Sequence, residues 1–353
     1  MYSEHDLQSA VSAGAISHEA AEALRSHANG LRAAPAADEE HFRLITGFND
    51  IFVTIAAVLL LVAAAGIGDA IAPGVAGLLV AGSAWGLAEY FTRQRRMALP
   101  SIVLMLAFVA GIAAIPINIL AEMDPKMADV TAALVGSGIG LLAAGAAFIH
   151  WRRFMVPITV AAGAGAVAVT VIALAMSAVI GSNPKLDPEP YLLPMVFVAG
   201  LAVFTVAMRW DMSDPARETR RSDVAFWLHL LAAPMIAHPL FHWLGVNDGQ
   251  NIGALAAVGV LAVYLLMGLV ALAVDRRALL VSALAYVLVA LTWLFREFGA
   301  VELNVALTGL VIGSALLALS AFWTPIRSAV VADCLVRCKT ACHAGLRWPP
   351  DII

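Results

Sequence analysis

Long apolar runs separated by short polar gaps fill this chain from about position 49 to position 323. The runs are apolar on every side, which is typical of helices surrounded by lipid rather than water. A helix needs about 20 residues to cross roughly 30 Å of hydrocarbon. The pattern predicts an all-α fold, a polytopic transmembrane helix bundle of about ten spans: Asn49–Ile67, Ile71–Phe91, Ala98–Ala121, Val130–His150, Phe154–Ile180, Tyr191–Met208, Val224–Leu244, Ile252–Val274, Leu279–Phe295 and Val301–Trp323.

The first two spans have the least secure separation, since only Gly68–Ala70 lies between them. If they formed one helix, the chain would have nine spans and its termini would lie on opposite sides. The positive charges argue against this, because Lys and Arg accumulate in cytoplasmic segments. Ten spans place eighteen of the 21 Lys and Arg residues on one side and leave Lys126, Lys185 and Arg296 on the other. This asymmetry predicts that both termini are cytoplasmic.

The composition supports a membrane protein and excludes some partners. Hydrophobic residues make up 61% of the chain and charged residues 13%, against about 25% charged in an ordinary soluble domain. The net charge is −4 and no basic stripe indicates nucleic acid. The polar first 48 residues have no apolar core near Met1, so we expect the first span to direct insertion. The sequence thus predicts a multi-pass membrane protein, with the lipid bilayer as a partner.

The segments outside the bundle are short. Ser3 with Asp6 gives a helix-start signal, and Gly14 is suited to end that helix. Ser17 starts a second helix that runs to about His27. The predicted organisation is a cytoplasmic helical hairpin (1–30), a linker (31–48), the ten-span bundle (49–323), and a basic cytoplasmic tail with a short amphipathic helix (324–353). A hairpin of this size buries no core alone, so we expect it to pack on the bundle or on a protein partner.

Several short stretches resemble a known group of proteins. They are Ala13–Ser17 between the hairpin helices, Gly47–Asp50 and Ala98–Ser101 at the starts of the first and third spans, and Pro349-Pro350 at the end of the basic tail. In these stretches and in layout the chain resembles uncharacterised bacterial predicted membrane proteins. The resemblance implies a multi-pass inner-membrane protein and brings no activity with it. The stretch from Cys334 to His343 departs from the Leu- and Arg-rich tail of that group.

Two carboxylates lie inside predicted spans near their cytoplasmic ends. A charge at the bilayer centre is costly and marks a functional-site hypothesis, but the span centres hold almost none, which argues against a proton-driven pump. Asp50 and Glu89 lie one or two turns from the predicted cytoplasmic boundary. They form either a paired acid site for a cation or proton, or two interfacial carboxylates that are hydrated or bonded to arginines such as Arg93.

The seventh span is the most polar and holds His229, Pro234, His238, Pro239 and His242. Proline removes a backbone donor and leaves a carbonyl that needs a partner at membrane depth. His238 and His242 lie one turn apart and predict an outward-facing pocket for a small solute or ion. Its other candidate residues are Pro116 and Asn118 of the third span and Arg296, Glu297 and Asn304 near the last two. The alternative is a hydrogen-bonded histidine pair at a helix interface.

Neither the histidines nor the three cysteines predict a metal or a cofactor. His238 and His242 lack a third ligand from the same segment. Cys334 and Cys342 would lie about 12 Å apart on a continuous helix, while thiolates on one zinc ion lie within roughly 4 Å of each other. Cys338, with Val331 and Leu335, instead continues an apolar stripe on a tail helix along the membrane surface.

Small residues predict close contacts between helices. Gly136, Gly138 and Gly140 lie together in the fourth span, and two further pairs have GxxxG spacing, Gly82 with Gly86 and Gly309 with Gly313. Glycine lets two helix backbones approach closely in a membrane. We expect helix packing at these positions.

These features together favour a non-enzymatic role, either small-solute transport or a membrane scaffold or sensor. Transport predicts broken helices and a polar cavity near the middle of the membrane, whereas a scaffold predicts a tightly packed bundle with its function in the hairpin. The alternative is a membrane-embedded enzyme that uses the histidine-rich seventh span. No Ser/His/Asp set or HExxH motif supports an enzyme.

Overall fold

The chain is described by a computed structural model over residues 4–24, 48–123, 127–183, 187–214, 219–245, 254–274 and 304–322, with 284, 287, 288, 291, 292, 325 and 326 in addition. Every regular element in these residues is a helix, so the all-α prediction is confirmed for this part of the chain. The chain divides into two compact units, Met1–Phe42 and Arg43–Ile353.

The first unit contains two short helices. Helix α1 spans Glu4–Ser12, and Gly14 follows it with φ of +71°, a left-handed conformation that glycine adopts without strain. The second helix covers 18–24, and Ser17 caps it by accepting a hydrogen bond on Oγ from the Ala20 amide at 3.1 Å. Gly14 and Ser17 thus take the roles that the sequence predicts. The continuation towards His27 lies outside the described residues.

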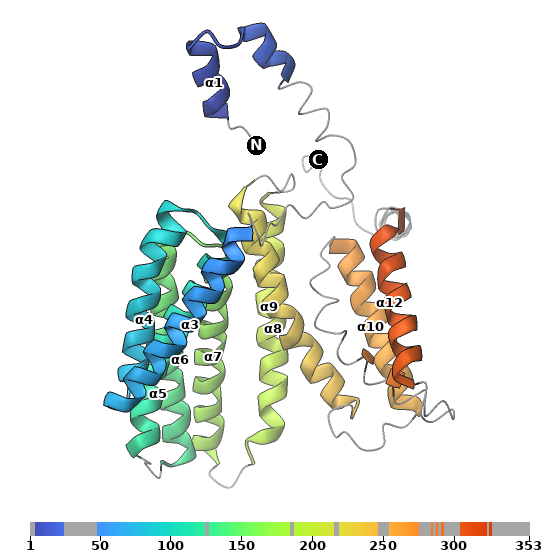
Figure 1. Ribbon diagram of the computed structural model, residues 1–353. Coiled ribbons are helices and arrows are strands. Elements are labelled where there is room, and N and C mark those ends of the chain that lie inside the picture. Colours follow the sequence, from blue (N-terminus) through green and yellow to red (C-terminus); the bar gives the residue numbers. More distant parts are fainter. Residues whose placement is uncertain are drawn as a thin grey trace, which may run out of the picture. The chain divides into compact units, whose positions relative to one another are not determined.

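The second unit is a series of helices (Figure 1). Their bounds are α3 Phe48–Ile71, α4 Val75–Ala88, the π-helix η1 Glu89–Gln94, α5 Ala98–Met123, α6 Asp129–Phe154, α7 Ile158–Ser182, α8 Glu189–Met212, α9 Arg220–Trp243, α10 Ala254–Val274 and α12 Asn304–Ala321. Six of these helices, α3 and α5 to α9, are long and apolar enough to cross a membrane.

The apolar surface of these helices faces outward. Only 17% to 28% of the apolar stretch is buried inside the protein in α3 and in α5 to α8, while the corresponding share in α9 is 50%. Large side chains such as Leu59, Val62 and Leu141 are about two-thirds exposed. Water would penalise such a surface by about 25 cal/mol per Å², whereas lipid tails would not. The exposure pattern therefore fits a bundle surrounded by hydrocarbon, with α9 as the most enclosed of these six helices.

The ends of the helices differ from the predicted spans. Helices α3 and α4 are separate, as predicted, but the turn lies at Ala72–Gly74, where Gly74 has φ of +82°. The break predicted at Gly68–Ala70 is wrong because Asp69 is exposed in the last turn of α3 and does not end the helix. Helix α6 extends to Phe154 and α9 begins at Arg220. Arg152 and Arg153, and Arg220 and Arg221, which lie between predicted spans, thus belong to helix ends.

The total of ten spans stays a prediction. Helices α10 and α12 fall within the eighth and tenth predicted spans, with shorter apolar stretches at Val258–Val274 and Leu307–Ala318. Helix α4 has only 14 residues before η1 continues it. The ninth predicted span, Leu279–Phe295, lies almost entirely outside the described residues.

Glycines allow the closest helix contacts, but not at all the predicted positions. A Cβ atom at Gly77 of α4 would lie 2.5 Å from the carbonyl oxygen of Gly111 of α5. A Cβ at Gly140 of α6 would lie 2.6 Å from Oγ1 of Thr170 of α7, so the contact predicted at Gly140 is confirmed. The prediction for Gly82 with Gly86 is wrong, since no described atom lies within 4 Å of a Cβ built at either. GxxxG spacing does not reveal which face of a helix meets its neighbour. At Gly136, Gly138, Gly309 and Gly313, too, no described atom lies within 4 Å of a built Cβ; close contacts at these four positions stay a prediction.

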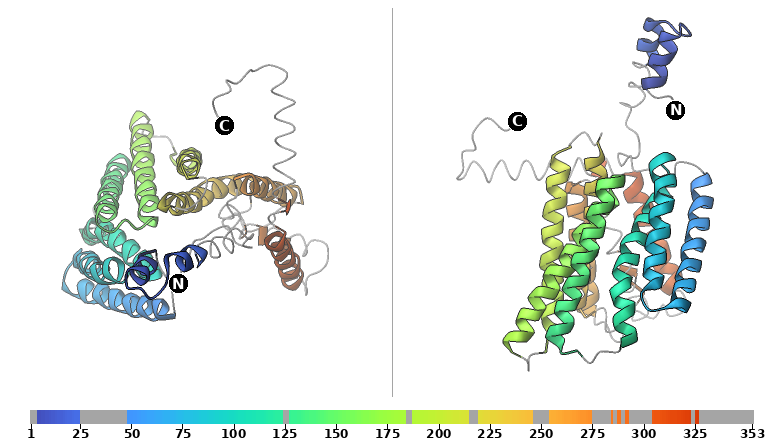
Figure 2. Two further views of the ribbon diagram at one scale, coloured as in Figure 1. Left: turned by 90° about the horizontal axis from the view of Figure 1, so that it is seen from above. Right: turned by 90° about the vertical axis from the view of Figure 1, so that its left-hand side faces the viewer.

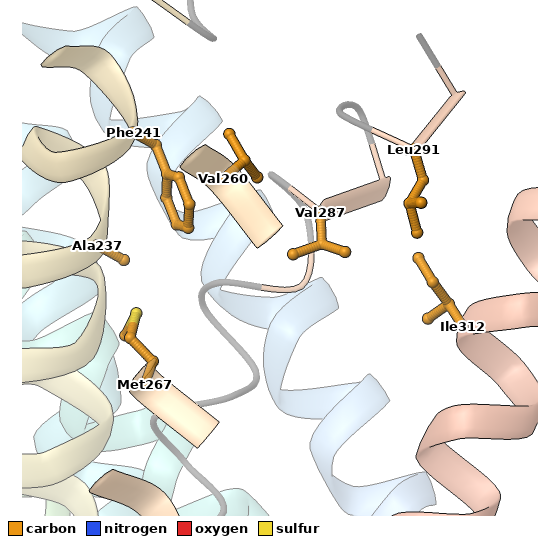
Figure 3. Packing of buried hydrophobic residues seen from close by; sticks show 7 residues of the cluster. All are labelled: Ala237, Phe241, Val260, Met267, Val287, Leu291 and Ile312. Carbon is orange, nitrogen blue, oxygen red and sulfur yellow. The ribbon is translucent and has the colours of Figure 1, made fainter. Parts of the chain in front are cut away.

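Helix α9 also packs against the later part of the chain. Figure 3 shows Ala237 and Phe241 of α9 near Val260 and Met267 of α10, with Ile312 of α12 further along the same cluster. An apolar cavity of about 630 Å³ lies beside this cluster, between α10 and α12. Its lining is aliphatic apart from Tyr264, so it offers little for polar recognition.

The positively charged helix ends meet at one end of the bundle. Successive helices from α3 to α9 run in opposite directions alongside one another (Figures 1 and 2). The starts of α3, α5, α7 and α9 therefore lie near the ends of η1, α6 and α8. This region carries Arg93, Arg95, Arg96, Arg152, Arg153, Arg209, Arg220 and Arg221, and we call it the arginine-rich end.

Candidate functional site

Buried polar side chains gather in the half of the bundle nearest the arginine-rich end. They are Asp50, Thr92, Ser101, His150, Thr159, Asp214, Ser222 and His229. Burying a polar group costs free energy unless it finds partners, so such a concentration needs either an internal network or a ligand. The outward-facing pocket predicted around His238 lies towards the opposite end of α9.

A cavity of about 400 Å³ opens among these residues and is lined by Asn49, Asp50, Tyr90, Phe91, Arg95 and Met97. We call it the Asp50 cavity. Its walls come from the first turn of α3, from η1 and from the residue that precedes α5. Asp50 is only 3% exposed, and its position in the first turn of α3 lets the positive end of the helix dipole stabilise the carboxylate. The cavity thus combines a buried acid with polar and aromatic walls.

The π-turn η1 positions one side of this cavity. The Arg95 amide donates to the Tyr90 carbonyl at 3.0 Å, five residues back. The Arg95 guanidinium also donates from Nε and Nη2 to the Tyr90 hydroxyl, at 3.1 and 2.9 Å. Tyr90 meets Phe91 edge to face with 5.0 Å between the ring centroids. Single π-turns often occur at functional sites, and this one brings Tyr90 and Arg95 to the same wall.

Glu89, the other predicted acid, is held by two arginines. Arg153 of α6 donates from Nε to Oε1 at 2.7 Å and from Nη2 to Oε2 at 3.0 Å. Arg93 donates to Oε2 at 3.4 Å. A bond from Glu89 to Arg93 is one of the two alternatives that the sequence analysis gave for this acid. The bidentate contact with Arg153 was not anticipated. Asp50 and Glu89 therefore lie in different surroundings, one lining the cavity and one in an ion-pair network.

A buried histidine, His150, lies on α6 one turn before Arg153. His150 is completely buried, and its Nδ1 lies 3.3 Å from Oγ1 of Thr159. The rings of Trp85, Phe108 and Phe154 surround it, with centroids 6.2, 5.7 and 4.6 Å away. Its Nε2 has no hydrogen-bond partner among the described residues. The aromatic surroundings indicate a packed core layer beneath the Glu89–Arg153 contact.

A second buried pair joins α8 to α9. Nε2 of His229 lies 3.2 Å from Oδ2 of Asp211, and the histidine is completely buried. The ring of Phe204 covers it edge to face, 5.2 Å away. Nearby, Oδ2 of Asp214 accepts hydrogen bonds from the amide and the hydroxyl of Thr219, at 2.9 and 2.6 Å. These contacts fix the turn between the two helices and the start of α9.

The residues of the predicted outward-facing pocket are only partly described. His238 and His242 are exposed on α9, with 6.5 Å between their ring centroids, and Asn118 is half-buried on α5. Arg296 and Glu297 lie outside the described residues, as do Cys334, Cys338 and Cys342. The pocket therefore stays a prediction. Within the described ranges, no group of three or more His, Cys, Asp or Glu side chains is arranged to hold a metal ion.

Sequence reasoning missed several residues of the arginine-rich end. Arg153 was counted among the cytoplasmic charges, His150 was only the last residue of a predicted span, and Asp211 was not singled out. Asp211 is 18 residues from its partner His229, and Arg153 is 64 residues from its partner Glu89. Residues that far apart are not brought together by the repeat of a single helix, so the sequence pattern does not reveal these contacts. One signal was present for His229, which is a titratable side chain inside an apolar span.

The described fold indicates a multi-pass helical membrane protein with a polar cavity at the end of its helices. No protein-family model, curated protein or solved structure matches this chain. Its function must therefore be inferred from the geometry of its own residues.

Proposed function

We propose that this chain is a non-enzymatic multi-pass protein of the bacterial inner membrane that binds a small solute in the Asp50 cavity and acts as a sensor or scaffold. It has about ten spans with both termini in the cytoplasm, so the cavity faces the cytoplasm. The observation that carries the proposal is a cavity of about 400 Å³ with a buried acid at the arginine-rich end. The resemblance to bacterial predicted membrane proteins supports the location.

The position of the cavity favours sensing over transport. Transporter sites usually lie near the middle of the bilayer, where helices are discontinuous. Asp50 instead lies in the first turn of α3 and Arg95 directly follows η1. Close backbone contacts at Gly77 and Gly140 hold neighbouring helices together, which suits a scaffold whose cavity is formed at its surface. The N-terminal hairpin would then offer a surface to a protein partner.

The orientation predicts which thiols are reached from outside the cell. Ser182, exposed at the end of α7, lies opposite the arginine-rich end. A maleimide that cannot cross membranes should label a Ser182→Cys variant in intact cells. It should leave the wild type unlabelled, because Cys334, Cys338 and Cys342 are expected in the cytoplasm. Permeabilised cells should label both proteins, and labelling of the wild type from outside would contradict the assignment.

The solute-binding role requires that water-soluble reagents enter the Asp50 cavity. Met97 lines the cavity although it is only 7% exposed, whereas Met105 of α5 is fully buried and is absent from the lining. In a background with the three native cysteines replaced by Ser, we expect a small charged thiosulfonate to modify Met97→Cys at least tenfold faster than Met105→Cys. Equal, slow reaction at both positions would show that the cavity is closed, and the proposed role would fail.

A further inference from the structure

The Asp50 cavity has walls of opposite charge. Asp50 contributes a carboxylate, and Arg95 contributes a guanidinium that stays charged at any physiological pH. Asn49 adds an amide, while the rings of Tyr90 and Phe91 add aromatic surface. A ligand with a single charge would meet attraction at one wall and repulsion at the other. A ligand with both charges would match both.

Arg95 has donors left for a ligand. A guanidinium has five N–H groups, and the Tyr90 hydroxyl accepts from only Nε and Nη2. Arg93 and Arg153 share Glu89, but no described carboxylate forms an ion pair with Arg95. The three remaining N–H groups are suited to a phosphate or a carboxylate, which guanidinium binds well.

The opposite wall suits an ammonium group. The Asp50 carboxylate attracts it directly. Tyr90 belongs to the wall of Arg95, whose Cζ lies 5.4 Å from the centroid of the Tyr90 ring, within the range of a cation–π contact. Tyr90 therefore stabilises the guanidinium rather than the ammonium group of the ligand. The volume of about 400 Å³ is at the small end of ligand pockets, which are about 300–1,000 Å³. It fits an amino acid or a headgroup rather than a nucleotide.

We propose that the Asp50 cavity binds a small zwitterion, with its ammonium group at Asp50 and its phosphate or carboxylate at Arg95. This inference rests on the proposed function and names the class of its ligand. Phosphoethanolamine has this chemistry, and it occurs both as a free solute and as the headgroup of phosphatidylethanolamine. A cavity at the helix ends lies at the level of lipid headgroups, so both sources reach it.

The test uses the full chain in nanodiscs of phosphatidylglycerol, with thermal unfolding as the readout. Added phosphoethanolamine should raise the unfolding temperature in a saturable way. Ethanolamine, which has only the cation, and inorganic phosphate, which has only the anion, should bind at least tenfold more weakly. Asp50→Asn and Arg95→Gln should each weaken the binding of phosphoethanolamine at least tenfold. Arg96→Gln is the matched control, since Arg96 is exposed and does not line the cavity, and it should leave binding unchanged.

A second set of nanodiscs, which contain phosphatidylethanolamine, distinguishes the lipid headgroup from the free compound as the ligand. If phosphatidylethanolamine in the bilayer stabilises the wild type and free phosphoethanolamine does not, the ligand is the lipid headgroup. Stabilisation by the free compound identifies a soluble zwitterion. The proposal fails if ethanolamine or phosphate alone binds as tightly as phosphoethanolamine, or if neither form binds. Rapid modification of Met97→Cys in that case would still support a solute-binding cavity, so the two failures are distinguishable.

The Arg95→Gln variant also shows whether a loss of binding could come from unfolding. Arg95 is exposed, so its replacement should not unfold the protein, and Arg95→Lys should restore part of the binding because it restores the charge. If Arg95→Gln retains full affinity in a folded sample, Arg95 does not bind the anion and the proposal is wrong.

Discussion

Replacing Gly77 by Ala is expected to destabilise the bundle by about 1–3 kcal/mol, the range typical of overpacking a close-packed interior. The added Cβ would lie 2.5 Å from the carbonyl oxygen of Gly111 and 2.9 Å from the amide nitrogen of Ile115. Both are backbone atoms of α5, so no side-chain rotation relieves the clash and the helices must separate. Thermal unfolding of the purified protein in nanodiscs should show a clear fall in the transition temperature.

Gly82 provides the matched control on the same helix. No described atom lies within 4 Å of a Cβ built there, and Ala has a higher helix propensity than Gly by about 1 kcal/mol. Gly82→Ala should therefore leave the transition temperature unchanged or raise it. Similar losses for the two substitutions would mean that α4 and α5 do not pack through Gly77.

Replacing His229 by Ala is expected to cost about 2–5 kcal/mol, as for other large buried side chains truncated to Ala. The side chain is completely buried, contacts Phe204, and lies 3.2 Å from a carboxylate oxygen of Asp211. The substitution leaves a cavity and removes one partner of a carboxylate that is itself mostly enclosed. Thermal unfolding in nanodiscs again measures the loss.

His238→Ala is the control, because it makes the same substitution at an exposed position of the same helix and should change stability much less. A double-mutant cycle with Asp211→Asn isolates the pair, and contacting residues usually couple by about 0.5–3 kcal/mol. Additive losses, or equal losses at His229 and His238, would contradict the structural importance of the pair.

The fold was largely predictable because its signal is local. The lengths of the apolar runs alone predict the ends of α5 to α9 to within a few residues, since nearly every residue of a lipid-facing helix is apolar. The errors lie at charged positions: Asp69, Arg152 and Arg153 were read as loop residues although all three belong to helix ends. Long side chains at a helix end reach the interface while their backbone stays helical, so charge alone does not mark where a span stops.

The candidate site was less predictable because it depends on tertiary contacts. Asp50 and Glu89 were found because carboxylates in apolar spans are costly, yet nothing local shows that Glu89 contacts Arg153, 64 residues away. Tyr90 and Arg95 are five residues apart, a spacing that places two side chains on different faces of a regular α-helix. Only the π-turn, which the sequence does not signal, aligns them.

The π-turn also accommodates one additional residue in the helix that ends at Gln94. A π-turn contains an additional residue relative to an α-turn, and one residue corresponds to about 100° of rotation in an α-helix. Loss of a single residue between Tyr90 and Arg95 would leave them four positions apart and let the π-turn close to an α-turn. Residues four apart are neighbours on one face of an α-helix, so the two side chains would still meet. In related chains, we therefore expect this segment to vary by a single residue, with an α-turn in place of the π-turn, and larger differences in length to fall in the Ala72–Gly74 turn.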